Sequence, residues 1–487
     1  MKEHNNLNSL LQRNIDIIQG QLNNPSDLIV RKMIVGDSSS INTALLYIDG
    51  IVNMQVVQDS IIEPLLTMKN IKQPHHKVEE VAYHHIKSGD VKISDLIEPL
   101  IEGLLKGKTI ILFDNCTKGI LTDTADWKER SIEEAVQERV IRGPIIGFSE
   151  KLKTNINLLR SIIQTQDLCV ESKQIGTHTK TDISILYVKG IAQEEIIEEV
   201  RTKINQINVK YLIESRLIEE YLEGRGKSIF PLVMTNERPD STVAALLEGR
   251  IAIFVNGTPH AILVPALFNQ FLQVTDEYYG KTARLTGRFL RFLSFILAVY
   301  IPGIYISIVH FHKGIIPDQI VKKLMGEEQV LIPVFWQIII LLVLLQFIMD
   351  GSFRLPRSAV IAVSLIGSIF VGEAAVNAKL VHTPSIIFMG LTYISSFLIL
   401  ARGFESAVFA LRFIFLLLGQ FFGFMGLIVG TTIMIIYATS LRSVGVPYLA
   451  PLIPFQLKEM KDILYRGNTK TLINSDHSYP YDRNKNK

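Results

Sequence analysis

The sequence of 487 residues is poor in cysteine and has almost no excess of either charge. Its two cysteines, Cys116 and Cys169, exclude a disulfide framework and a cysteine-ligated zinc site. The 50 basic and 47 acidic residues leave a net charge of +3, which is too small to indicate nucleic-acid binding. A disordered chain is also excluded, because the hydrophobic content of 48% provides ample apolar surface to bury.

Motifs for common enzyme chemistry are missing as well. Gly107-Lys108-Thr109 resembles part of a phosphate-binding loop, but Glu102 stands where that loop needs its first glycine. The sequence contains neither a Gly-x-Ser-x-Gly turn nor a His-Glu-x-x-His motif. Four histidines between 75 and 85 lie in a polar helical pattern without converging acidic or thiol ligands. We therefore expect no enzymatic activity, no metal site and no cofactor.

Charged residues are scarce in the C-terminal third, where only 15 lie between 289 and 440. Five apolar segments of membrane-crossing length follow one another there: 292–312, 329–349, 358–380, 380–401 and 413–441. The last is too long for one upright crossing, and its four glycines, which include Gly423, can break it into a hairpin. The pattern predicts a polytopic α-helical transmembrane domain with five or six spans.

The distribution of basic residues predicts the orientation of these spans. The chain opens without an apolar core of signal-peptide length, so we expect the N-terminal domain to stay in the cytosol. Lys281, Arg284, Arg288 and Arg291 precede the first span, which is typical of a cytosolic flank. Basic residues after 441 place the tail on the same side, which favours an even number of spans.

The N-terminal part contains a diverged internal repeat. LYIDGIV at 46–52 matches LYVKGIA at 186–192, and GKTIILFDNCTKGIL at 107–121 resembles GRIAIFVNGTPHAIL at 249–263. The first offset is 140 residues and the second begins at 142. Each copy combines strands, a helical pattern and a hairpin turn. The repeat therefore predicts an α/β soluble domain of two related subdomains, ahead of the transmembrane domain.

These patterns divide the chain into five parts. They are a polar N-terminal segment at 1–40, a first α/β subdomain with a connecting helix at 41–150, a second α/β subdomain at 151–288, transmembrane helices at 289–441 and a cytosolic C-terminal tail at 442–487.

Two polar turns in the soluble domain are candidates for function. The turn at Arg142, Gly143 and Pro144 leads into a helix with one apolar stripe. The other turn has the sequence ERPD at 237–240. Neither has a nucleophile or a metal-ligand set, so we expect a role in assembly or in coupling to the membrane domain. Arg142 and Glu237 can pair between the subdomains, or both turns can be solvated with weak ion pairs.

The third apolar segment carries an ionisable residue, Glu373, on the helical face opposite a row of small residues. Such a residue within a span is a functional candidate, and its alternatives are a structural pair with Arg412 or a position at the outer interface. In a ring of subunits, the Glu373 carboxylates would attract cations, and the apolar residues beside them would form a hydrophobic gate. The alternative is that the helical face with the small residues lines the pore. The candidate pore residues are Ala362, Ile366, Phe370, Glu373 and Asn377.

Several long motifs are similar to those of the GerA family of spore germination proteins, and specifically to its A subunit. They are RGPIIGFSEKLKTNINLLR (142–160), IGTHTKTDISILYVKGIA (175–192), ERPD (237–240), LLEGRIAIFVNGTP (246–259), DEYYGK (276–281), RLP (354–356), GEAAVNAKLV (372–381) and PYLAPLIPF (447–455). The chain departs from the family pattern at 346–353, where charged residues of the family are replaced. We assign the following residues to assembly or coupling: Arg142, Gly143, Pro144, Glu150, Asn155, Arg160, Glu237, Arg238, Pro239 and Asp240.

The resemblance implies a subunit of a nutrient germinant receptor in the inner membrane of a spore. It implies two partners, a transporter-like B subunit and a lipoprotein C subunit, besides the surrounding lipid. It further implies a homo-oligomer, a pentamer, that acts as a nutrient-gated cation channel. A secondary transporter and a non-conducting scaffold are the alternatives, although paired inverted repeats typical of transporters are missing from the sequence.

Overall fold

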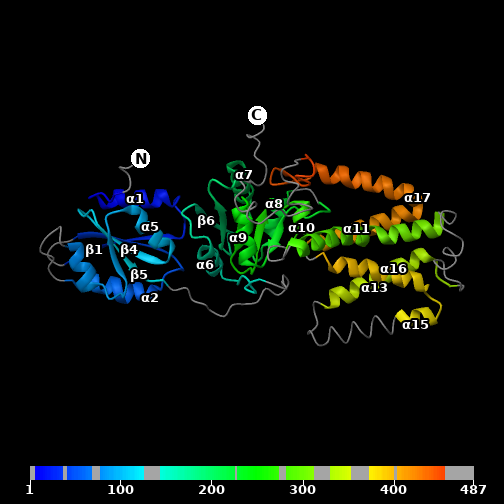
Figure 1. Ribbon diagram of the computed structural model, residues 1–487, viewed down its shortest axis with the longest axis horizontal. Helices are drawn as coiled ribbons and strands as arrows, with labels where there is room; N and C mark the ends of the chain where they lie inside the picture. The colour runs from blue at the N-terminus through cyan, green and yellow to red at the C-terminus, as the bar shows by residue number, and fades with distance from the viewer. Residues whose placement is uncertain are drawn as a thin grey trace. The chain divides into compact units, whose positions relative to one another are not determined.

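The computed structural model describes residues 6–36, 41–68, 77–125, 143–224, 228–273, 281–311, 330–352, 372–399 and 403–455. These residues form two compact units. The first unit consists of the described residues up to 224 together with 235–265, and it contains two five-stranded sheets. The second consists of 228–234 and the described residues from 266 onward, and it contains the long apolar helices (Figure 1).

The first sheet has the strand order β1-β2-β4-β5-β3, and all its neighbouring strands are antiparallel. Its strands are β1 (Leu28–Val35), β2 (Ile41–Ile48), β3 (Val91–Ser94), β4 (Lys108–Phe113) and β5 (Gly119–Asp123). Successive side chains of a strand point to opposite faces, so Leu45 and Leu46 of β2 enter two different hydrophobic cores. The sheet is therefore apolar on both faces and needs a cover on each.

Helices supply both covers, which makes the first subdomain a three-layer structure (Figure 1). The Leu46 face packs against α1 (Leu11–Gln21) and α5 (Ile97–Leu105) through residues such as Ile18 and Leu100. The Leu45 face packs against five short helical segments. They are α2 (Met54–Val57), η1 (Gln58–Ile62), α3 (Glu63–Leu66), α4 (Lys77–Glu80) and η2 (Val81–His85).

The second sheet repeats the first, with the strand order β6-β7-β9-β10-β8. Its strands are β6 (Leu168–Ile175), β7 (Thr181–Val188), β8 (Met234–Asn236), β9 (Ile251–Val255) and β10 (Ala261–Val264). Thr43 of β2 lies opposite Phe113 of β4, and Ile183 of β7 lies opposite Val255 of β9. Thr43 and Ile183 are 140 residues apart, and Phe113 and Val255 are 142 residues apart, which are the two offsets of the sequence repeat. The predicted relationship between the two subdomains thus extends to strand order and register.

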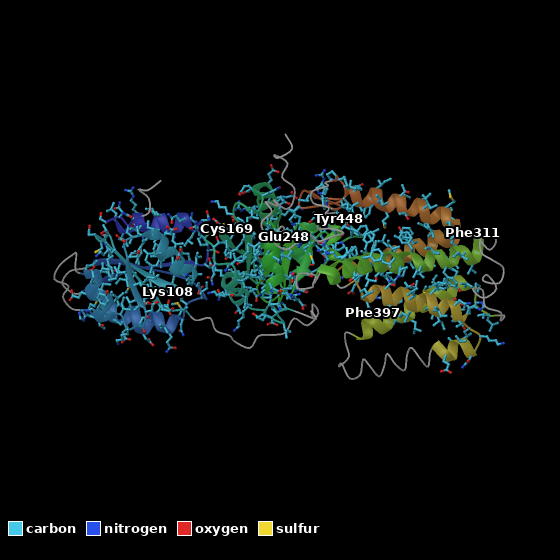
Figure 2. The ribbon with its side chains drawn as sticks, in the orientation of Figure 1. Lys108, Cys169, Glu248, Phe311, Phe397 and Tyr448 are labelled. Atoms are coloured by element: carbon cyan, nitrogen blue, oxygen red, sulfur yellow. The ribbon has the colours of Figure 1, made fainter. Side chains whose placement is uncertain are left out.

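Within the described residues, four helices accompany the second sheet. They are α6 (Leu152–Ile162), α7 (Glu194–Asn205), α8 (Arg216–Glu223) and α9 (Pro239–Leu247). Helices α6 and α9 pack on each other and against β7 and β9, while α7 packs against α8. Lys108 on β4 and Cys169 on β6 mark the two subdomains in Figure 2.

The prediction that 1–40 is a polar N-terminal segment ahead of the first subdomain is wrong, because this segment contains both α1 and β1. Helix α1 forms a buried stripe from Leu11, Ile15 and Ile18, at the spacing of successive helical turns. Strand β1 is an edge strand whose middle is exposed and charged, so alternating hydrophobicity does not reveal it in the sequence. The first subdomain therefore begins before residue 41.

The second unit is mainly helical. Its elements are α10 (Phe268–Phe271), α11 (Lys281–Phe311), α13 (Val334–Ser352), α15 (Gly372–Asn377), α16 (Thr383–Phe397), α17 (Phe404–Ser440), β11 (Arg442–Ser443) and β12 (Val446–Pro447). Among the described residues, Leu285–Phe311 and Phe404–Ser440 are long and apolar enough to cross a membrane, and Val334–Phe347 is a shorter apolar helix. A helical, apolar C-terminal region is thus present, and the number of spans stays a prediction.

Helix α17 folds back on itself. Its 37 residues are interrupted at Gly423, whose φ of 59° and ψ of −146° are not helical. Phe404 at its start and Tyr437 near its end both lie against Phe230, each with a ring-centroid distance of 6.3 Å. One straight helix cannot bring its two ends to the same residue, so the predicted break of the last apolar run into a hairpin is confirmed (Figure 1).

The first part of the predicted C-terminal tail is packed into the second unit. The side chain of Ser443 donates a hydrogen bond to the Leu232 carbonyl at 2.5 Å and accepts one from the Ala266 amide at 2.9 Å. Tyr448 is fully buried among aromatic rings that include Phe268. An apolar sequence following a tight hairpin explains this packing, so a free tail cannot begin at 442.

Candidate functional site

A buried ion pair joins the two subdomains of the first unit. Arg160 on α6 donates from Nε to Asp27 Oδ2 at 2.5 Å and from Nη2 to Asp27 Oδ1 at 2.9 Å. The two side chains are only 3% and 10% exposed. A two-point contact between a guanidinium and a carboxylate fixes orientation as well as distance. Because Asp27 directly precedes β1, the pair fixes the second subdomain to the first sheet.

Close backbone contacts reinforce this junction. The Ser26 amide donates to the Val170 carbonyl on β6 at 2.9 Å, so the start of the first sheet reaches the edge of the second. Gly50 has a φ of 90°, and a Cβ at this position would lie 2.4 Å from the Asn157 side chain on α6. The positive φ favours glycine here, and a side chain would also displace the Asn157 amide.

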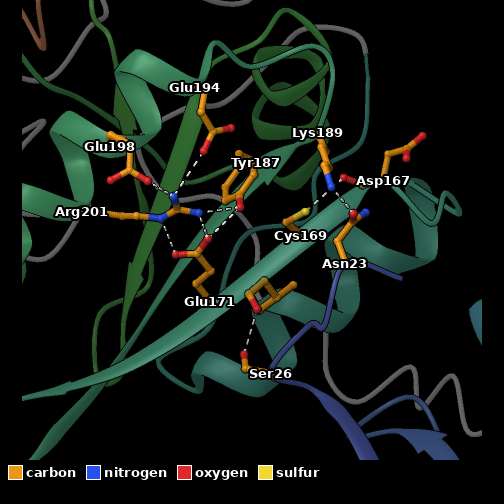
Figure 3. Close-up of polar contacts among 11 residues, drawn as sticks. Asn23, Ser26, Asp167, Cys169, Glu171, Tyr187, Lys189, Glu194, Glu198 and Arg201 are labelled. Atoms are coloured by element: carbon orange, nitrogen blue, oxygen red, sulfur yellow. Dashed lines mark hydrogen bonds and ion pairs between the residues drawn. The ribbon is translucent and has the colours of Figure 1, made fainter. Parts of the chain in front are cut away.

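A polar pocket of about 360 Å³ lies at the same junction. Residues from the end of α1 line one side, and residues from β6, β7 and α7 line the rest (Figure 3). The lining residues are Gly20, Asn23, Asn24, Cys169, Glu171, Tyr187, Lys189, Glu194 and Arg201. Two of them are cationic and two are anionic, so the lining is balanced in formal charge.

Arg201 on α7 organises one wall of the pocket (Figure 3). Its Nε donates to Glu171 Oε2 at 3.0 Å, and its Nη2 bonds to both Glu171 Oε1 and the Tyr187 hydroxyl. That hydroxyl donates in turn to Glu171 Oε1 at 2.7 Å. Glu198 pairs closely with Arg201 Nη1, whereas Glu194 lies 3.4 Å from the same nitrogen. The wall is thus a connected network with one loosely held carboxylate.

The network fixes the protonation of its members. Burial raises the pKa of Glu171, but hydrogen bonds from Arg201 and Tyr187 outweigh burial and leave that pKa below its usual value. Burial and the hydrogen bond to Glu171 raise the pKa of Tyr187, so its hydroxyl stays protonated. Near neutral pH the wall therefore presents a carboxylate, a guanidinium and a neutral hydroxyl.

The opposite end of the pocket carries Lys189 and Cys169. The Lys189 ammonium donates to Asn23 Oδ1 of the first subdomain at 2.5 Å. The Cys169 thiol is 3% exposed and points its hydrogen toward the Asp167 carbonyl, with an S···O distance of 3.6 Å. Burial raises the pKa of Cys169, so this thiol is not an activated nucleophile.

A second buried cluster has the residue types of a hydrolase triad without its geometry. Ser215 Oγ donates to Glu219 Oε1 at 2.9 Å and lies 2.9 Å from His260 Nε2. Glu219 approaches the same Nε2 at 3.9 Å, whereas a triad needs its carboxylate on the other ring nitrogen. The cluster therefore joins α8 to the loop before β10, and its geometry does not activate Ser215.

The predicted turn at 237–240 forms the start of α9 within the second subdomain. Arg238 is 1% exposed and pairs with Asp240. Pro239 occupies the first turn of the helix, where its missing amide hydrogen costs nothing. The Glu237 carbonyl accepts a hydrogen bond from the Phe148 amide at 2.9 Å, which ties the turn to the segment before α6.

The motif before α6 forms a structured loop. Asn155 is fully buried and closes this loop, since its side chain accepts from the Ser149 amide at 2.8 Å and donates to the Ser149 carbonyl at 2.6 Å. The Glu150 carbonyl accepts from the Gly257 amide at 2.7 Å. Gly143 and Pro144 are exposed. Arg142 lies outside the described residues, so its expected pairing with Glu237 stays a prediction.

Of the candidate pore residues, Glu373 and Asn377 lie on α15, and both are exposed. The others, Ala362, Ile366 and Phe370, lie outside the part of the chain that the structure describes. No ion pair joins Glu373 to Arg412 within the described ranges, so the alternative of a structural pair receives no support there.

Arg412 instead joins three helices of the second unit. From α17, its Nε donates to the Ala298 carbonyl of α11 at 2.8 Å, and its Nη2 donates to the Ser396 hydroxyl of α16. The guanidinium carbon also lies 4.9 Å from the centre of the Tyr393 ring. With a side chain only 3% exposed, Arg412 is part of the packing between these helices.

The sequence did not reveal the pocket, although one signal for it was present in the repeat. Cys169, Glu171 and Arg201 stand where the first copy has Ile29, Arg31 and Ile61. A polar cluster in only one copy of a repeat indicates a feature that the shared fold does not require. Asn23, which bonds to Lys189 in this pocket, comes from the segment 1–40 that was predicted to be a polar N-terminal segment.

Comparisons with known proteins identify the family. Residues 16–477 match the family model described as Bacillus/Clostridium GerA spore germination protein. Spore germination protein KA of Bacillus subtilis (strain 168) is 34% identical over 94% of this chain and 84% of its own length. Spore germination protein B1 of the same strain is 31% identical over 96% of both chains.

The chain is also similar to a solved structure, the N-terminal domain of the A subunit of the Bacillus megaterium spore germinant receptor GerK3. That similarity has 31% sequence identity and a TM-score of 0.43, and it covers 54% of this chain and 97% of the other. The chain belongs to the GerA family of spore germination proteins. The resemblance seen in its motifs is confirmed, and the family and the apolar helices together associate the chain with a membrane.

Proposed function

We propose that the chain is the A subunit of a nutrient germinant receptor in the inner membrane of a spore, where it helps to trigger germination. The observation that carries this proposal is the family match from 16 to 477, which runs through the soluble and the apolar units. Relatives named as spore germination proteins support it. In this role the chain relays a signal and catalyses no reaction.

The proposal includes a channel. Copies of the chain form a homo-oligomer, a pentamer, that conducts cations when the receptor has bound its nutrient. The support is the exposed carboxylate of Glu373 at the start of a short helix in an apolar unit, because a ring of such carboxylates concentrates cations. A transporter-like B subunit and a lipoprotein C subunit complete the receptor, and the soluble domain faces the cytosol.

The buried pair of Arg160 and Asp27 supports the relay role of the soluble domain. Two subdomains that are joined by a buried two-point ion pair and by further contacts such as Ser26 to Val170 can move together as one body. A displacement of either subdomain is then transmitted to the other, because the junction between them is rigid.

Deleting the gene in its spore-forming host tests the receptor role. Spores of the deletion strain should fail to germinate in at least one nutrient, as measured by the fall in optical density of the suspension. Reintroducing the gene should restore that response. Unchanged germination with every nutrient tested would overturn the receptor role.

Cation flux into liposomes tests the channel role, with the chain alone and with its partner subunits. Glu373→Gln should lower the flux while the purified complex keeps its size. Glu405→Gln, which removes an exposed carboxylate of α17 outside the candidate pore residues, serves as the control. A saturable flux of one solute coupled to an ion would favour a secondary transporter. The absence of any flux from the assembled complex would favour a non-conducting scaffold.

A further inference from the structure

We propose that Pro302 and Arg412 form a hinge with a lock in the second unit, so that α11 bends at Pro302 when Arg412 releases it. The contact itself is independent of the receptor role, whereas its use in signalling rests on that proposed function. The argument starts from a carbonyl that Pro302 frees and from the donor that meets it. It then turns to the partners of α11 on either side of Pro302.

Pro302 lies inside α11 and removes one hydrogen bond from that helix. In an α-helix each amide donates to the carbonyl four residues earlier, so the acceptor for residue 302 is the Ala298 carbonyl. Proline has no amide hydrogen, and its ring also pushes against this carbonyl. Ala298 is fully buried in an apolar unit, where an unpaired carbonyl is costly. The Ala298 carbonyl therefore needs a donor from outside α11.

Arg412 on α17 is that donor. Its Nε donates to the Ala298 carbonyl at 2.8 Å, although the two residues are 114 positions apart in the sequence. The guanidinium is buried, and its Nη2 also bonds to the Ser396 hydroxyl on α16. Membrane helices tolerate an internal proline where a neighbouring helix satisfies the freed carbonyl. The proline of one helix and the arginine of another are thus a matched pair.

Helix α11 has different partners on either side of Pro302. Figure 1 shows α11 beside both α17 and α16, and it packs against each of them. Ahead of the proline, the Tyr300 hydroxyl lies 2.9 Å from Thr431 Oγ1 on α17. Beyond the proline, the Tyr305 hydroxyl lies 3.1 Å from Ser385 Oγ on α16. A movement of α16 relative to α17 therefore has to bend α11 between these two tyrosines.

The helix is weakest at the same place. Pro302 is followed by Gly303, and proline and glycine have the lowest helix propensities. Sharp bends in helices occur mainly at such residues. Arg412 opposes a bend here, because its bonds to Ala298 and Ser396 join α17 to both other helices. Bending separates the guanidinium from one of these two partners, which makes Arg412 the lock of the hinge.

The hinge bears on the candidate pore residue Glu373 through α16. Glu373 lies on α15, which ends at Asn377, and α16 begins shortly afterwards at Thr383. Val381 in this short connection belongs to the same hydrophobic core as Tyr305. A displacement of α16 therefore carries the Glu373 carboxylate with it. In the receptor, the closed hinge holds this carboxylate in place and the released hinge moves it.

A double-mutant cycle on the full chain purified in detergent tests the lock, with Tm as the readout. Arg412→Gln should lower Tm. Pro302→Ala should reduce that fall by about half, because alanine supplies the amide that the Ala298 carbonyl needs. Pro384→Ala is the control, since Pro384 lies in the first turn of α16, where a proline costs no helical hydrogen bond. An equal fall in the wild-type and Pro302→Ala backgrounds would overturn the lock.

Spores that carry single variants test the hinge. Pro302→Ala and Pro302→Gly both supply the missing amide, but glycine leaves the helix flexible. At equal amounts of the chain in the spore membrane, Pro302→Ala should slow nutrient germination several-fold. Pro302→Gly and Pro384→Ala should keep a rate close to that of the wild type. A wild-type rate with Pro302→Ala, or an equally slow Pro302→Gly, would overturn the hinge.

The deletion strain distinguishes this failure from failure of the receptor role. If the chain has no receptor role, the deletion strain germinates at the wild-type rate, and the use of the hinge in signalling falls with that role. If only the hinge is wrong, the deletion strain loses its nutrient response while Pro302→Ala germinates like the wild type. The Tm cycle judges the lock in either case.

Discussion

Asp27 and Arg160 form a two-point ion pair that spans the two copies of an internal repeat. The pair itself is not repeated. The counterpart of Asp27 at the offset of 140 is Asp167, but the counterpart of Arg160 is Gly20, which has no side chain to offer. The two subdomains therefore share a fold and strand register, while the contact between them is specific to this one junction.

Removing one member of this pair should strongly destabilise the junction. Arg160→Ala leaves the Asp27 carboxylate buried without its partner, and such a loss costs about 3–5 kcal/mol. Lys153→Ala breaks another pair between the subdomains, with Asp49, but its side chains are 72% and 31% exposed, and we expect a loss of under about 1 kcal/mol. Thermal unfolding of the full chain compares the two variants, and equal shifts in Tm would contradict the assignment.

The sequence predicts the repeat well because it depends on local patterns. LYIDGIV and LYVKGIA each mark a central strand that ends at a glycine, and those strands occupy the same place in both sheets. The break at Gly423 follows in the same way, from an apolar run too long for one crossing.

Contacts between elements far apart in sequence were beyond such patterns. Arg160 was predicted to have a role in assembly or coupling. Its partner Asp27 lies 133 residues away, in the segment that was predicted to be a polar N-terminal segment. A pair with Glu373 was one alternative for Arg412, and Arg412 bonds instead to a backbone carbonyl and a hydroxyl on two other helices. Spacing along one element indicates which face a residue occupies, but not which neighbour meets it.

The pocket network should make stability depend on acid pH. The pKa of Glu171 is lowered in the folded chain, so the stability it contributes is fully present above its usual pKa of 4.5 and is lost as the pH falls through the lower, folded-state value. The Tm of the wild type should therefore fall below about pH 4.5 more steeply than that of Glu171→Gln. Glu195→Gln, which removes a carboxylate of α7 outside the network, should follow the wild type. Parallel curves for wild type and Glu171→Gln would contradict the network.

Close packing of α11 against α17 should not tolerate a methyl group. A Cβ at Gly419 would lie 2.4 Å from the Gly303 carbonyl oxygen, which belongs to the backbone of α11 and cannot move aside on its own. Gly419→Ala should therefore lower the stability by about 1–3 kcal/mol and lower Tm. Gly390→Ala on α16 is the control, since a Cβ there meets nothing within 4 Å and alanine favours the helix. A Gly419→Ala variant as stable as this control would disprove the close contact.

Separate roles for Glu373 and Arg412 lead to the last prediction. Arg412 is buried and bonds to Ala298 and Ser396, so Arg412→Gln should lower the Tm of the purified chain by removing a connection between three helices. Glu373 is exposed on α15, so Glu373→Gln should leave Tm nearly unchanged and lower only cation flux in liposomes. The double variant distinguishes independence from pairing, because effects on Tm add when two residues do not interact. Two single variants with equal losses of Tm, and a double variant no worse than either, would restore the structural ion pair that the third apolar segment first suggested.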